Sequence, residues 1–66
     1  MNNREKLIEL ITEYELDRRD VAELVSVKRD MVDHWLASHE SKMHEEVPDM
    51  AIELLELKLK LKNSST

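Results

Sequence analysis

The sequence predicts a small all-α protein, and three observations support this prediction. The 66 residues include no Gly and one Pro, and 38% are charged; a chain rich in Leu, Glu and Lys favours helix. Apolar residues recur at intervals of three and four along most of the chain. Residues that cap helices precede several of these runs. We therefore expect a single domain over residues 1–66 with about four helices, the last of them Leu-rich.

The first predicted helix follows the N-terminus. Asn2 and Glu5 have the spacing of a capping box, in which each side chain bonds the other residue's backbone amide. Apolar residues then repeat at helical intervals, at Leu7, Ile8, Ile11 and Tyr14. The opposite side, expected to face water, carries Arg4, Glu5, Lys6, Glu9 and Glu13. This helix would cover the back of the segment that follows.

Residues 16–38 predict two short helices joined by a tight turn. Asp17 is a good N-cap for the first of them, and the second runs from about Lys28 to Ser38. The small Ala22 lets two steeply crossed helices approach closely. The inward residues are Val21, Ala22 and Val25 in the first helix, Val27 in the turn, and Val32, Trp35 and Leu36 in the second. This spacing is typical of a helix-turn-helix, whose second helix is presented to the DNA major groove.

These same residues resemble a known family. The match to the DNA-binding core of small phage-repressor-type regulators, the lambda-repressor-like or Cro-like proteins, rests on Val21, Ala22, Val25, Val27, Val32 and Trp35. The later stretch VPDMAIELLELKL resembles the closing helix of several small phage regulators. The resemblance implies a helix-turn-helix fold and a transcriptional regulator that binds double-stranded DNA.

The sequence departs from the family pattern at three places. Ser26 stands where the family usually has Gly, and Lys28 stands where a Ser or Thr commonly caps the recognition helix. Two acids, Asp30 and Asp33, lie on that helix. Ser26 is small and can still serve the turn, whereas the acids oppose DNA binding without affecting the fold.

The outward residues of the two helices are the candidate DNA contacts. Basic side chains suit phosphates and guanine, Asp33 suits a cytosine amino group, and His34 suits a phosphate or a base. The full predicted set is Arg18, Arg19, Lys28, Arg29, Asp33 and His34. The alternative is a solvated face of mixed charge, with Arg18 and Arg19 paired to nearby acids such as Asp20 and Glu23.

Residues 39–46 form a polar connector, expected to be a loop or a frayed helix extension. The three histidines of the chain, at positions 34, 39 and 44, are five residues apart. Two metal ligands on one helical face require a spacing of four, and the chain has no Cys. We therefore predict neither a metal site nor a cofactor.

The C-terminal helix is expected over residues 47–62, with Pro48 in its first turn and a frayed tail over residues 63–66. One apolar stripe comprises Met50, Leu54, Leu57 and Leu61, and a second comprises Ala51, Leu55 and Leu59. Either both stripes close the core, or the second stripe packs on the core and the first packs on a second copy of the chain; we favour the dimer.

From residue 56 to 62 the apolar residues alternate as in a strand, but Leu and Lys favour helix, so we predict helix there.

Two functions remain open. The leading hypothesis is a sequence-specific regulator, acting as a repressor, that binds an inverted-repeat operator as a homodimer. The net charge of −5 favours the alternative, a helix-turn-helix module that binds a protein as an anti-repressor, antitoxin or inhibitor.

The sequence contains no nucleophile–base constellation, so it does not suggest an enzyme. No apolar run predicts a membrane span or signal peptide, and the absence of Cys suits the cytoplasm of a bacterium or phage-infected cell.

Overall fold

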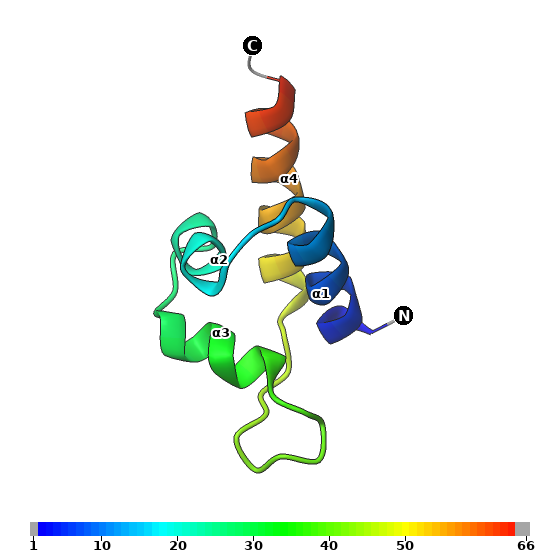
Figure 1. The fold of residues 1–66 in the computed structure, drawn as a ribbon, viewed down its shortest axis with the longest axis vertical. Coiled ribbons are helices and arrows are strands. Elements are labelled where there is room, and N and C mark those ends of the chain that lie inside the picture. Colours follow the sequence, from blue (N-terminus) through cyan, green and yellow to red (C-terminus); the bar gives the residue numbers. More distant parts are fainter. Residues whose placement is uncertain (1, 65–66) are drawn as a thin grey trace.

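The computed structural model describes residues 2–64, with side chains described for residues 2–62. Within residues 2–64 it contains no strand and four helices, namely α1 (Asn3–Glu13), α2 (Arg18–Leu24), α3 (Arg29–Leu36) and α4 (Asp49–Ser64). The prediction of a small all-α domain is thus confirmed. Figure 1 shows α1 lying beside α4, while α2 and α3 form the other side of the molecule. None of these helices has the length and apolarity needed to cross a membrane.

The N-termini of α1 and α2 are capped as the sequence predicts. The Asn2 side chain accepts a hydrogen bond from the Glu5 amide at 2.8 Å, and the Glu5 carboxylate accepts one from the Asn2 amide at 3.4 Å. Asp17 and Asp20 form the same reciprocal pair at the start of α2, at 2.9 and 3.0 Å. These caps satisfy backbone amides that have no partner inside the helix.

Helix α3 is shorter than the predicted range of residues 28–38. Lys28 occupies the N-cap position but makes no capping bond through its side chain, because an ammonium group cannot accept a hydrogen bond from an amide. At the other end, Ala37 has an extended backbone (φ −60°, ψ 149°). The helix therefore ends at Leu36, and Ser38 belongs to the connector.

Helix α4 differs from the predicted range of residues 47–62 at both ends. Val47 precedes the helix and is buried, and the Pro48 carbonyl accepts a bond from the Ala51 amide at 3.0 Å. The helix continues to Ser64, so the prediction of helix at residues 56–62 is confirmed. The tail expected at residues 63–66 is wrong for residues 63 and 64, and residues 65 and 66 lie outside the described part of the chain.

The core is built from all four helices and the connector. The inward residues predicted for the helix-turn-helix are buried, except that Val27 and Leu36 are only partly buried. Trp35 is 4% exposed and Val32 is fully buried. Among the residues with described side chains, the buried core comprises Leu7, Val21, Ala22, Val25, Val32, Trp35, Val47, Ile52, Leu55 and Leu59. This packing fixes α2 and α3 against a support made by α1 and α4.

Candidate nucleic-acid interface

The turn between α2 and α3 has the tight geometry of a helix-turn-helix. Ser26 adopts a left-handed backbone conformation with φ 58°. This conformation allows the Val27 amide to reach back to the Ala22 carbonyl at 3.0 Å. Glycine is the residue that adopts positive φ without steric cost. A Gly at this position would therefore adopt the conformation of Ser26 at lower steric cost.

The outward face of α3 is exposed at its start and partly covered further along. Lys28, Arg29 and Asp30 are exposed, whereas Asp33 and His34 are only partly exposed. The basic residues thus precede or begin the helix, but Asp30 lies beside them in its first turn, and Asp33 follows in the next. A ligand that approached α3 from solvent would meet Lys28 and Arg29 at one end of the helix.

Two of the predicted contact residues bind each other. Arg18, the first residue of α2, forms an ion pair with Asp33 of α3, and the two side chains are 50% and 41% exposed. Neither Asp20 nor Glu23, the partners suggested by sequence, takes this role for Arg18. Exposed ion pairs contribute roughly 0–1 kcal/mol. The pair links the two helices weakly, and it also offsets the charge of Arg18 near α3.

Three arginines lie around one surface hollow. Arg18 and Arg19 from the start of α2 and Arg29 from the start of α3 line a hollow of about 430 Å³, together with Asp17. The three arginines come from positions up to eleven apart in sequence, and the packing of α2 against α3 brings them together. Arg19 and Arg29 suit an anion with several oxygens, such as a phosphate, while Asp17 in the lining and the ion pair of Arg18 with Asp33 reduce the positive charge there.

His34 faces the connector rather than standing clear in solvent. Its Nδ1 lies 3.0 Å from the Met43 carbonyl oxygen, and its own carbonyl accepts a bond from the Glu45 amide at 3.0 Å. His34 also lines a hollow with Asp30, Asp33 and Met43. This second hollow is acidic and lies beside Met43, which is 59% exposed.

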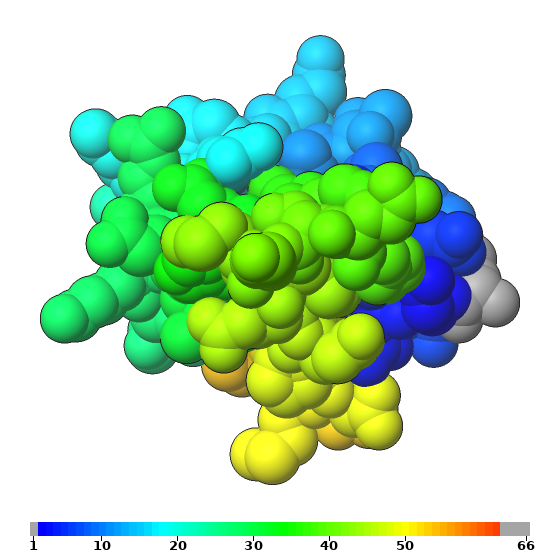
Figure 2. Space-filling model, turned by 90° about the horizontal axis from the view of Figure 1, so that it is seen from below, coloured from blue at the N-terminus to red at the C-terminus, as the bar shows by residue number. Residues whose placement is uncertain are grey.

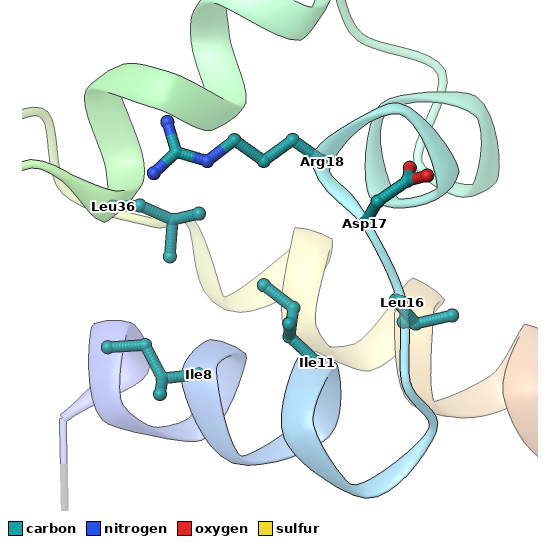
Figure 3. A pocket seen from close by; sticks show the side chains of 6 residues that line it. All are labelled: Ile8, Ile11, Leu16, Asp17, Arg18 and Leu36. Atoms are coloured by element: carbon teal, nitrogen blue, oxygen red, sulfur yellow. The ribbon is translucent and has the colours of Figure 1, made fainter.

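An apolar hollow separates α1 from the start of α2 and the end of α3. It measures about 420 Å³ and is bordered by the apolar side chains of Ile8, Ile11, Leu16 and Leu36. Figure 3 shows Arg18 extending from α2 toward α3 along the rim, while Asp17 points away. Arg18 therefore lines this hollow as well as the arginine hollow.

Two basic residues hold the ends of α2 and α3 and were not recognised in the sequence. Arg4, expected to face water, is partly buried and donates from Nε to the Ala37 carbonyl at 3.1 Å and from Nη2 to the Leu36 carbonyl at 3.0 Å. Lys58 donates from Nζ to the Leu24 carbonyl, the last of α2, at 2.6 Å. Cations at helix C-termini satisfy free carbonyls and oppose the helix dipole. In the sequence, the only sign of these two contacts was that the neighbouring helices carry basic residues.

The two apolar stripes of α4 have different surroundings. In the second stripe Leu55 and Leu59 are buried, and Ile52 is buried beside them. In the first stripe Met50, Leu57 and Leu61 are 79%, 56% and 60% exposed, and Leu54 is partly buried against the core. Within residues 2–62 the first stripe therefore leaves most of its apolar surface open to solvent.

Comparison with known proteins does not identify this chain, since no family model, no curated protein and no solved structure matches it. The resemblance to lambda-repressor-like regulators therefore stays a prediction from the residues named above.

Proposed function

We propose that this protein is a sequence-specific DNA-binding regulator that presents α3 to the major groove. The hollow lined by Arg18, Arg19 and Arg29 together with Asp17 is the observation that carries the proposal, because the first helix of a docked helix-turn-helix crosses the phosphate backbone. The exposed Lys28 and Arg29 at the start of α3 add to its support.

The proposed contacts divide into two kinds. Arg19 binds phosphates and sets the register of the protein on the duplex, and Arg18 joins it when its ion pair with Asp33 opens. Lys28 and Arg29 reach guanine or the adjacent phosphate. Asp33 and His34 adjust which sequence is preferred once they leave Arg18 and Met43, their partners in the free protein. Bound beside a promoter, the protein would act as a repressor by blocking polymerase.

The regulator would bind as a homodimer through the first stripe of α4. Met50, Leu54, Leu57 and Leu61 follow each other at intervals of four, three and four, which is the spacing that packs one helix against another. Figure 1 shows the end of α4 extending beyond the other helices, where a second copy has access. Two copies would place their α3 helices on half-sites about one turn of DNA apart, or a multiple of that spacing.

The dimer is tested by Leu57→Glu. This substitution places a charge in the stripe and should give a monomer in sedimentation experiments at a concentration where the unmodified protein is dimeric. Met43→Glu, which changes a similarly exposed residue in the connector, is the matched control and should leave the dimer intact. An unchanged molecular mass for Leu57→Glu would exclude this stripe as the interface.

DNA binding is tested by selecting bound sequences from a random duplex pool at moderate salt and then titrating the selected duplex with salt. We expect an inverted repeat, with the logarithm of affinity falling linearly against the logarithm of salt concentration. Arg29→Ala should weaken specific binding by about 1–3 kcal/mol. Lys6→Ala removes the same charge from α1, outside the arginine hollow, and should change affinity little.

A protein partner is the second candidate function. The hollow lined by Asp30, Asp33, His34 and Met43 offers carboxylates beside an exposed apolar side chain, which suits a basic segment of another protein. The net charge of −5 points the same way. If the duplex pool yields no enriched sequence even at low salt, DNA binding is excluded and a partner that loses affinity for Asp30→Asn is expected instead.

A further inference from the structure

The connector between α3 and α4 brings two histidines and a glutamate together. One ligand atom from each of His39, His44 and Glu46 lies within 4.8 Å of the others. The rings of His39 and His44 meet edge to face, with centroids 4.5 Å apart. The helical spacing rule that argued against a metal site does not apply here, because residues 39–46 are not helical. Figure 2 shows the connector spread across one end of the molecule, between α3 and α1.

His44 is held with one nitrogen directed into this cluster. Its side chain is 8% exposed, and its Nδ1 lies 2.9 Å from the Ala37 carbonyl oxygen. A carbonyl can only accept, so Nδ1 carries a proton and donates it. In the neutral ring, Nε2 then keeps its lone pair. That atom is buried and has no hydrogen-bond partner within the described structure.

The atom facing Nε2 is also an electron-pair donor. Oε1 of Glu46 lies 3.5 Å from Nε2 of His44. The contact between these two atoms is favourable when either a proton on Nε2 or a metal cation lies between them. A tetrahedral metal ion with bonds of about 2.1 Å separates its ligand atoms by about 3.4 Å. The existing distance between these two atoms therefore already fits a shared metal.

We propose that His39, His44 and Glu46 bind a divalent transition metal of the zinc class, with water completing four-coordination. Imidazole nitrogen selects Zn²⁺ and its neighbours over Mg²⁺ and Ca²⁺, which prefer oxygen. A metal-bound histidine usually donates its other ring N–H to an acceptor, and the hydrogen bond from His44 to the Ala37 carbonyl has this role. His39 and the 81% exposed Glu46 side chain can turn toward an ion, while His44 stays fixed.

The proposed metal would fix the connector to the end of α3. The connector already contacts α3 through the Glu45 amide and the His34 carbonyl at 3.0 Å, and through Met43 and the His34 ring. His44 contacts the same helix end at Ala37. A bound ion would join residues 39 and 46 across this segment, so it should stabilise the folded protein. This inference does not depend on whether α3 binds DNA.

The test is a Zn²⁺ titration of the full, tag-free chain after treatment with a chelator. Calorimetry should give one saturable Zn²⁺ site per chain, the melting temperature should rise with Zn²⁺, and Mg²⁺ should have neither effect. Co²⁺ should give the visible absorption of a four-coordinate ion. In nitrogen-resolved NMR the His44 Nε2 resonance should shift on Zn²⁺ addition, while Nδ1 keeps its proton.

Variants of the two accessible ligands make the test specific. His39→Asn and Glu46→Gln should each weaken Zn²⁺ binding by at least about tenfold and leave the metal-free melting temperature unchanged, because both side chains are exposed. Glu40→Gln makes the same chemical change as Glu46→Gln outside the cluster and should retain Zn²⁺ binding. Absence of saturable binding, equal binding by all three variants, or a proton on His44 Nε2 in the presence of Zn²⁺ would each overturn the proposal.

Discussion

Replacing Arg4 by Met should destabilise the protein because Arg4 closes the end of α3. The guanidinium group makes two charge-assisted hydrogen bonds, to the carbonyls of Leu36 and Ala37, at 3.0 and 3.1 Å. Hydrogen bonds to charged groups contribute roughly 1.5–3 kcal/mol each. Ala37 keeps a second partner in His44, and both carbonyls can regain some water. We therefore expect a total loss of about 2–3 kcal/mol in the free energy of unfolding.

The assay is urea denaturation followed by the fluorescence of Trp35 and by circular dichroism, at one fixed protein concentration. Trp35 lies in α3 and is 4% exposed, so its emission reports the packing of the helix that Arg4 caps. In a domain of this size a loss of 1 kcal/mol lowers the melting temperature by roughly 4–8 °C. The expected fall for Arg4→Met is therefore on the order of 10–20 °C.

Two further variants show whether geometry or charge is responsible. Arg4→Lys keeps the positive charge but replaces the planar fork by a single ammonium group, so it should recover about half of the loss. Lys6→Met removes an exposed cation from the same helix and should change stability by less than about 0.5 kcal/mol. A loss below about 0.5 kcal/mol for Arg4→Met, or an equal loss for Lys6→Met, would refute the reasoning.

Three other substitutions test the support of the helix-turn-helix. Ser26→Gly should raise the free energy of unfolding by about 0.5–1 kcal/mol, because φ is 58° there; a lower urea midpoint would contradict this. Lys58→Met should cost about 1–2 kcal/mol through the lost bond to Leu24, whereas Lys42→Met, in the connector, should cost little in the same denaturation assay. Leu55→Ala should cost about 2–5 kcal/mol because Leu55 is buried; an unchanged melting temperature would mean that α4 packs through another face.

The sequence alone predicted the helices in order and most of the core-facing residues of α2 and α3, whereas in α1 Ile8 is 37% exposed and Arg4 is partly buried, both against expectation. The capping pairs at Asn2 and Asp17 and the burial of Val21, Val32 and Trp35 all agree with the pattern. These features depend on residues within a few positions of each other, so they leave a readable spacing. Helix ends were less well predicted, since Val47 enters the core before α4 begins.

The candidate site was predicted only in part. Sequence identified the basic residues of α2 and α3 but assigned Arg18 no contact with Asp33, the residue it pairs with. It also treated His39 and His44 as unrelated because their spacing does not fit a helix. Irregular backbone has no fixed period, and the three-dimensional path of a connector cannot be read from the distance between residues in sequence.

The sequence by itself determined that this chain forms four helices with a helix-turn-helix pattern, because helix periodicity and capping are local properties. The tertiary structure decided which side chains complete those helices and which gather into sites. Arg4 reaches Ala37 across 33 positions, and Lys58 reaches Leu24 across 34. Such contacts arise from the packing of whole helices, and a charged residue at either end carries no local sign of its distant partner.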